Sequence, residues 1–116
     1  MKKLLASLPI LAVAAALVVP ATGAATQTIT VKETNFKIRL AAVPRAGKVR
    51  FVIKNASGIE HDFHLRGGGI ERESRELRGG QTAVLTATLK RGVRYRVWCG
   101  VGGHAAAGMK TSFVAR

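Results

Sequence analysis

Three residues whose side chains bind soft metal ions lie close together near the end of the chain: Cys99, His104 and Met109. The alternation of residues 93–99 places Cys99 on the core-facing side at the end of a strand, and the glycine-rich loop after it can curl back. We therefore expect the three side chains to converge on one point. A thiolate, an imidazole and a thioether together suit copper, and a second imidazole would complete a trigonal site with a weak axial sulfur.

The second imidazole must come from elsewhere, and His61 and His64 are the two candidates. Because they are three residues apart on an expected strand, their side chains face opposite sides. His61 shares its side with the apolar Phe63 and Leu65, whereas His64 shares its side with charged residues. We therefore predict that His64 is a solvated surface histidine. The predicted ligands of one copper ion are His61, Cys99, His104 and Met109.

Alternation with a period of two residues dominates the chain after residue 25, and no apolar pattern at helical spacing runs beyond about two turns. Between two glycine clusters, the segment from Ile70 to Leu77 carries alternating charges, and we interpret it as a surface excursion, either a short helix or a solvated loop. About seven short strands separated by Gly, Pro and Asn turns predict an all-β fold, a Greek-key antiparallel β-sandwich. The expected strands are 28–33, 36–40, 49–54, 62–66, 82–89, 93–99 and 110–114.

The composition limits the kinds of protein that this chain can be. It has 116 residues, of which 47% are hydrophobic, so one compact domain is expected and a two-domain enzyme or a disordered chain is excluded. With Cys99 as its single cysteine, the chain can form neither an intramolecular disulfide nor a four-cysteine zinc or iron–sulfur site.

The first residues are typical of a cleavable secretory signal peptide. Lys2 and Lys3 precede an apolar run over 4–19, and small residues follow up to Ala25. The run is shorter than the roughly 20 residues of a membrane-spanning helix, and Pro9 interrupts it. We therefore expect a signal peptide over 1–24, a copper-binding domain over 25–116, and a periplasmic or extracellular location.

The mature domain is expected to be strongly basic. Removing the two lysines of the signal from 19 basic residues leaves 17 against 6 acidic ones, a net charge of +11. The basic residues are scattered along strands of an exported chain with few aromatics, so we expect no nucleic acid partner. The charge either steers the protein toward an acidic redox partner or an anionic membrane surface, or serves only solubility. A monomer is expected.

The order of these residues resembles that of the cupredoxins, the type 1 blue copper proteins, with plastocyanin-like and azurin-like members. An asparagine turn leads to the first histidine, from Asn55 to His61, and a Cys, His, Met loop follows late in the chain. The spacing of that loop is most similar to the rusticyanin and sulfocyanin types. The resemblance implies a cupredoxin-like sandwich. It also implies that electrons enter and leave through the edge of His104.

Two residues beside the first histidine differ from the pattern of that family. Glu60 and Asp62 stand where Pro and Asn are frequent. The asparagine helps to tie the two ligand loops together in the family, so Asp62 either does this through its carboxylate or does not do it. Glu60 brings an anionic group toward the site.

These features predict an exported electron carrier that cycles between Cu(II) and Cu(I) and exchanges single electrons with redox protein partners. A fixed ligand set that both oxidation states tolerate makes such transfer fast. Oxidase or nitrite reductase chemistry would require further histidines, and the chain has three in all, so we expect no enzyme. The alternative is a periplasmic copper carrier or resistance protein without a redox role.

Overall fold

The structure is a computed structural model, and it describes residues 2–15 and 25–116. Residues 2–15 are exposed and belong to neither a helix nor a strand. The expected cleavage position of the signal peptide lies outside the described residues, so the signal peptide and the domain boundary stay predictions. In the part of the chain that the structure describes, no helix has the length and the apolar character that crossing a membrane requires.

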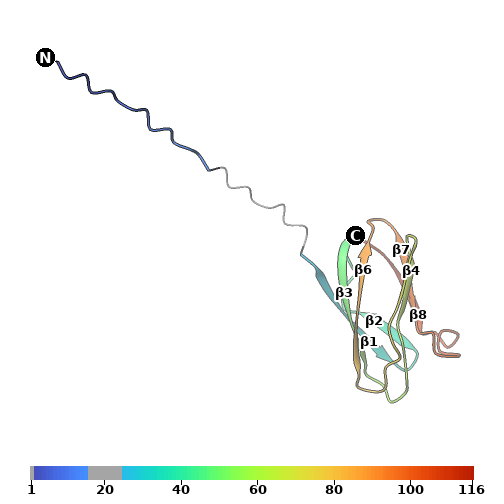
Figure 1. Ribbon diagram of the computed structural model, residues 1–116. Coiled ribbons are helices and arrows are strands. Elements are labelled where there is room, and N and C mark those ends of the chain that lie inside the picture. The colour runs from blue at the N-terminus through green and yellow to red at the C-terminus, as the bar shows by residue number, and fades with distance from the viewer. Residues whose placement is uncertain (1, 16–24) are drawn as a thin grey trace.

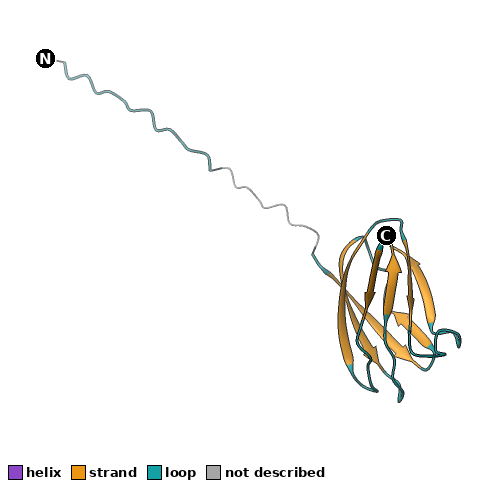
Figure 2. Cartoon of the chain, turned by 45° about the vertical axis from the view of Figure 1, so that its right-hand side comes forward, coloured by secondary structure: helices purple, strands orange, loops and turns teal. Residues whose placement is uncertain are grey.

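The described residues form eight strands and no helix, and the strands make two sheets that pack face to face (Figures 1 and 2). One sheet has the strand order β2-β1-β3-β6 and the other β5-β4-β7-β8. The predicted all-β sandwich is confirmed. The strands are β1 (Gln27–Thr34), β2 (Lys37–Leu40), β3 (Gly47–Asn55), β4 (His64–Gly67), β5 (Ile70–Glu73), β6 (Thr82–Leu89), β7 (Arg94–Trp98) and β8 (Lys110–Val114).

The core lies between the two sheets and follows from the alternation in the sequence. In β3, Val49, Phe51 and Ile53 are fully buried while Lys48 and Arg50 between them are exposed. The facing strands β4 and β7 contribute their own buried alternate residues to the same apolar cluster. Each fully buried large apolar side chain contributes about 1.5–3 kcal/mol, so a domain of this size without disulfides depends on this cluster.

Five of the six strand pairings are antiparallel, as expected, but β1 and β3 pair in parallel. The cause is the chain path. β2 turns back along one edge of β1, and residues 41–46 then carry the chain to the other edge of β1. The reversal at β2 leaves β3 running in the same direction as β1.

The charged segment after β4 lies at the surface, as interpreted, but Ile70–Glu73 is neither a short helix nor a loop, because it forms β5 and pairs with β4. Gly68 and Gly69 form the two-residue connection, with φ angles of 56° and 81°. Two successive positive φ angles match the right-handed twist of a tight hairpin, and glycine adopts them without strain. The charges then alternate along a hairpin arm, and Leu77 beyond it is fully buried.

The second sheet determines where the predicted ligands meet. β4 and β7 are antiparallel neighbours, and His64, the first residue of β4, lies opposite Trp98, the last residue of β7. The segment that precedes β4 and the segment that follows β7 therefore leave the sheet at the same end. His61 belongs to the first segment and Cys99 to the second.

Gly67 tests the packing of β4 on β7. A Cβ atom at this position would lie 2.6 Å from the carbonyl oxygen of Arg94 and 2.7 Å from Cδ1 of Tyr95. We expect Gly67→Ala to lower the free energy of unfolding by about 2–3 kcal/mol, because both contacts are with fixed parts of the neighbouring strand. Gly58→Ala is the control, since a Cβ there meets nothing within 4 Å. Equal urea midpoints for the two variants would show that β4 does not pack as described.

Candidate metal centre

A short backbone bridge holds His61 in place ahead of β4. The N–H of His61 donates to the carbonyl of Leu77 at 3.0 Å, and the N–H of Leu77 donates back to His61 at 2.7 Å. The buried amide of Asn55 donates to the carbonyls of Ile59 and Leu77, and its oxygen accepts the N–H of Ser57. The turn at the end of β3 is therefore pinned to the same backbone, and His61 is directed inward and fully buried.

The loop after β7 folds back on itself through backbone hydrogen bonds. The N–H of Cys99 donates to the carbonyl of Met109, and the N–H of Met109 donates to that of His104, both at 3.1 Å. A further bond of 3.1 Å runs from the N–H of His104 to the carbonyl of Val101. These bonds close the loop, so the three residues share one small region at the end of the sandwich.

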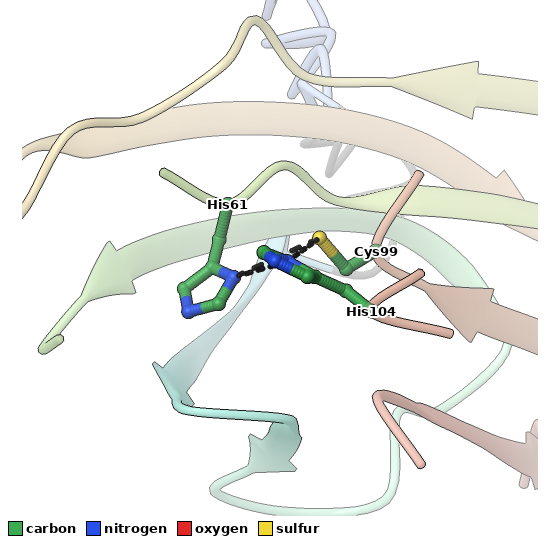
Figure 3. Close-up of side chains that lie close together, drawn as sticks. All are labelled: His61, Cys99 and His104. Carbon is green, nitrogen blue, oxygen red and sulfur yellow. Dashed lines mark hydrogen bonds between the residues drawn. The ribbon is translucent and has the colours of Figure 1, made fainter. Parts of the chain in front are cut away.

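Three of the four predicted ligands point toward one another, as Figure 3 shows for His61, Cys99 and His104. The two Nδ1 atoms lie 3.1 Å apart, and the Sγ of Cys99 lies 3.8 Å from the Nδ1 of His61 and 3.6 Å from that of His104. A point equidistant from the three atoms of this triangle lies about 2.0 Å from each, close to the usual length of a metal–imidazole bond. The triangle therefore has the size of a metal site with two nitrogens and one sulfur.

Met109 is fully buried in the core cluster that also contains Cys99. Its backbone is bonded to both loop ligands, as described above, which places it beside the donor triangle. Its role as an axial ligand stays a prediction.

Asp62 ties the two ligand-bearing segments together. Its carboxylate oxygen Oδ1 accepts the N–H of Gly100, and its own N–H donates to the Sγ of Cys99 at 3.5 Å. Of the two possibilities for this residue, the structure has the one in which the carboxylate makes the connection. The sulfur therefore keeps a hydrogen-bond donor beside it that favours the thiolate.

Burial changes the proton affinity of two of the candidate ligands. Burial lowers the pKa of His61 below 6.5, and the neighbouring His104 lowers it further, while Asp62 opposes them. Burial also raises the pKa of the Cys99 thiol above its ordinary value of 9.0, against the effect of backbone N–H groups. The metal-free chain at neutral pH therefore holds a neutral imidazole and a protonated thiol, and a metal ion that binds must displace the thiol proton.

His64 is not a solvated histidine, which corrects the expectation from sequence, and it lies outside the donor triangle. Its side chain is 16% exposed, and its ring stacks on Trp98 with 5.2 Å between centroids. Nε2 lies 3.0 Å from Asp62 and Nδ1 lies 3.5 Å from Glu73. The pairing of β4 with β5 brings Glu73 to His64, and its pairing with β7 brings Trp98. Of the three partners, only Asp62 is near His64 in the sequence.

Glu60 lies at the surface rather than against the donor triangle. Its side chain is about half exposed, and its carboxylate lies 3.9 Å from the guanidinium of Arg78. Solvent screens such an exposed pair strongly. The anionic group that the sequence places next to His61 is therefore directed toward a cation and away from the buried donors.

Phe36 covers His104, a contact that the sequence analysis missed. It lies in the two-residue turn between β1 and β2 and has a φ angle of 65°, the one positive value outside glycine among the described residues. Its ring meets His104 edge-on at 5.1 Å between centroids. A phenylalanine in this region of backbone space is strained, and no local signal in the sequence predicts it.

Glu33 is the second residue that the sequence analysis missed, although the alternation of β1 contains the signal. It continues the buried side of Ile29 and Val31 and is fully buried at the end of the strand. Within the described chain, the buried side-chain polar atoms without a hydrogen-bond partner are its two carboxylate oxygens and the Nε2 of His61. Burial, with a smaller contribution from Asp62, raises the pKa of Glu33 to about 8.

Comparison with known proteins identifies the fold. A scan against protein-family models and a search of curated protein sequences found no match. Among solved structures, reduced auracyanin from the photosynthetic bacterium Roseiflexus castenholzii is similar with a TM-score of 0.67 and 18% identity over 78% of this chain and 98% of the other. Auracyanin B gives the same TM-score and identity, over 78% of this chain and 88% of the other.

A third solved structure is that of auracyanin A, described as a "blue" copper protein from Chloroflexus aurantiacus. It has a TM-score of 0.62 and 20% identity over 77% of this chain and 99% of its own. These likenesses confirm the cupredoxin fold that the sequence predicted. The likeness to rusticyanin or sulfocyanin types in particular stays a prediction.

The raised pKa of Glu33 predicts a pH dependence of stability. An unfolded chain releases this proton near 4.5, whereas the folded chain keeps it until about 8. The unfolded state therefore binds fewer protons between these values, and the stability of the folded state falls as pH rises through them. We expect Glu33→Gln to remove this loss, and to gain on the order of 3 kcal/mol over the parent between pH 5 and pH 8.5.

The measurement is urea unfolding of the metal-free protein at both pH values. Glu76→Gln is the control, because Glu76 is exposed. The difference in unfolding free energy between Glu33→Gln and the parent should grow with pH, and that for Glu76→Gln should stay constant. Parallel pH curves for all three proteins would mean that Glu33 is ionised in the fold at neutral pH.

Proposed function

We propose that this chain is an exported mononuclear type 1 copper protein that carries single electrons between redox partners. The observation that carries the proposal is the buried triangle of two imidazole nitrogens and one cysteine sulfur. This donor set on a cupredoxin fold is the one that blue copper sites use, and auracyanin A, which has the same fold, is described as a blue copper protein.

The residues fit a copper ion by donor type as well as by spacing. His61, Cys99 and His104 supply two nitrogens and one soft sulfur, and Met109 is the expected weak axial donor. Bound copper would supply a couple between Cu(II) and Cu(I) that takes up and releases one electron.

The chain supports that chemistry by keeping its donors in one arrangement. The bridge between His61 and Leu77 fixes the first imidazole, and the loop bonds between Cys99, His104 and Met109 fix the other donors. Transfer is fast when little moves as the electron arrives, so these backbone bonds have a direct kinetic consequence. The N–H of Asp62 stabilises negative charge on the sulfur after the thiol proton has left.

The two imidazoles have different access to solvent. His61 is fully buried, whereas His104 is partly exposed and lies in the loop at the end of the sandwich. His104 is therefore the proposed port for electrons at that end. The small apolar surface around it, with Val101, Ala105 and Ala106, suits brief docking of a partner.

The number and type of donor residues favour electron transfer over the two alternatives. Copper oxidase or reductase chemistry would need a second centre, and His64, the remaining histidine, is engaged by Asp62 and Glu73. A copper carrier without a redox role would be expected to use clusters of methionine and histidine, and the mature domain has Met109 as its only methionine. A copper-loaded chain without a reversible one-electron couple would support the carrier instead.

The proposed location is outside the cytoplasm, and the proposed partners are redox proteins. The basic N-terminal pair and the apolar run support export. The excess of 17 basic over 6 acidic residues in the domain favours partners with acidic surfaces or contact with anionic membranes over nucleic acid. A monomer suits repeated short encounters.

Substitution of the cysteine tests the copper site directly. We expect Cys99→Ser to abolish the intense visible absorption of the copper-loaded domain, because the charge-transfer band requires the thiolate. His64→Ala should keep the band and lower the unfolding free energy by about 1–2 kcal/mol, because its contacts with Trp98 and Asp62 are lost. Visible and EPR spectra with urea unfolding measure both. Bleaching by His64→Ala would show that His64, and not His61, is the ligand.

Substitution of the methionine tests the axial position. Met109→Gln should retain copper and lower the reduction potential, since an amide oxygen is a harder donor that favours the oxidised ion. We expect a shift of at least about 59 mV, which corresponds to a tenfold change in the relative affinity for the two oxidation states. Cyclic voltammetry of the mature protein measures the shift. Met109 is the only methionine there, because Met1 is removed with the signal peptide. An unchanged potential would remove Met109 from the site.

A further inference from the structure

The outer face of the second sheet carries a basic hollow beside the donor triangle. Its volume is about 610 Å³, and its lining residues belong to β4, β7, the start of β8 and the loop before β8. Three cations line it, Arg66, Arg96 and Lys110, and no acidic residue does. We name this surface the arginine hollow. Trp98, Ala105 and Ser112 are further lining residues.

The register of the strands explains why the cations gather there. Arg66 of β4 lies directly opposite Arg96 of β7, and Lys110 of β8 lies opposite Trp98 of β7. All three cationic side chains point outward and are exposed. Like charges on facing positions repel, so this arrangement weakens the sheet and favours an anion on its surface.

The described residues contain one ion pair, between Arg78 and Glu60, and two close contacts of carboxylates with the ring of His64. None of these involves a cation of the arginine hollow. The acidic residues nearest in register are on β5, where Glu71 lies opposite Arg66 and Glu73 lies opposite His64. Glu73 is engaged by His64 at 3.5 Å. Glu71 makes no ion pair with Arg66 within 4.0 Å, and neither Arg96 nor Lys110 has an acidic residue opposite it in register. The positive charge of Arg96 and Lys110 is therefore available to a molecule from solution, and Glu71 offsets that of Arg66 in part.

The arginine hollow is lined by the sequence neighbours of two donors, Cys99 and His104. Trp98 is covalently next to Cys99 and lines the hollow. Ala105 is covalently next to His104 and lines the same hollow. A molecule bound there would contact the residue before Cys99 and the residue after His104. An electron would therefore have a short path from either donor.

We propose that the arginine hollow is a docking surface for the acidic face of a redox protein that accepts an electron from this chain by way of Trp98. This inference rests on the proposed function. The occupant follows from charge complementarity, because three exposed cations that make no ion pair in the described chain favour a carboxylate-rich surface. In each encounter a copper(I) ion held by His61, Cys99 and His104 would give up one electron, the acceptor of the partner would gain it, and no proton or covalent bond would change.

The kinetic experiment uses a small anionic oxidant as the probe. Reduced, copper-loaded protein is mixed with hexacyanoferrate(III), which takes one electron to become hexacyanoferrate(II), and the return of the visible band is followed by stopped flow. The hollow variant is Arg66→Gln with Arg96→Gln and Lys110→Gln. The control variant is Arg39→Gln with Arg50→Gln and Lys54→Gln, which removes the same charges from exposed positions on β2 and β3 of the other sheet.

We expect the hollow variant to react about tenfold more slowly than the parent at low ionic strength and to lose most of its salt dependence. The control variant should react within about twofold of the parent. The cationic oxidant tris(1,10-phenanthroline)cobalt(III) should react at least as fast with the hollow variant as with the parent. Equal slowing of both variants by hexacyanoferrate would reduce the effect to net charge and overturn the proposal.

A binding experiment on the copper-free chain separates this proposal from the copper site. Decaglutamate is titrated into the ¹⁵N-labelled protein, and shifts are expected at Arg66, Arg96 and Trp98 in the parent and in the control variant, but not in the hollow variant. Absence of these shifts in the parent overturns the docking surface whatever the copper chemistry is. A failure of the copper spectrum with intact decaglutamate shifts contradicts the proposed function alone.

Vesicles of phosphatidylglycerol are the third probe, because an anionic membrane offers a related charge. Sedimentation with these vesicles that requires the arginine hollow, together with no decaglutamate shifts, would assign this face to a membrane and overturn the protein partner. Equal sedimentation of the parent, the hollow variant and the control variant would show that the arginine hollow does not bind the membrane, and would support the protein partner.

Discussion

The tie that Asp62 makes between the segment before β4 and the loop after β7 is the constraint on which the site depends. The two segments leave the sheet at the same end because His64 and Trp98 are paired at the ends of antiparallel neighbours. Emerging together is not enough to fix the donors, since either segment alone is a loop. The carboxylate of Asp62 holds Gly100, and its N–H contacts the sulfur of Cys99, so both loops take one relative position.

The same end of the sandwich concentrates the polar groups that the core has to bury. Asn55, His61 and Glu33 are the buried polar residues of the described chain, and Asn55 alone has a partner for every polar side-chain atom. An unpartnered buried polar group costs about 1–3 kcal/mol, so Glu33 and His61 lower the stability of the metal-free fold. Local sacrifice of stability is common where a fold prepares donors for a ligand.

The site presents two different surfaces to the outside. At the end of the sandwich, His104 is partly exposed, and Phe36 packs on its edge from a strained turn. On the outer side of the second sheet, Trp98 leads from Cys99 to a basic hollow. The first surface is small and apolar, and the second is polar and positive. In the proposed role as an electron carrier, the chain would receive an electron at one surface and deliver it at the other, and this division follows from the loop and the strand that supply its donors.

Local alternation in the sequence determined the β-sandwich, because the direction of a side chain on a strand depends on its neighbours in sequence. The order of Cys99, His104 and Met109 placed three donors in one loop. His61 lies ahead of β4, and its inward direction depends on the bridge to Leu77, which is distant in sequence. The pairing register of the strands determined which residues lie beside one another across strands, and alternation cannot predict this. His64 is half-buried because β5 and β7 bring Glu73 and Trp98 to it, and two glycines with positive φ make β5 a strand. The alternation of β1 buries Glu33, but its lack of partners depends on what faces it across the core. Such neighbours are distant in sequence, so only the tertiary structure determines them.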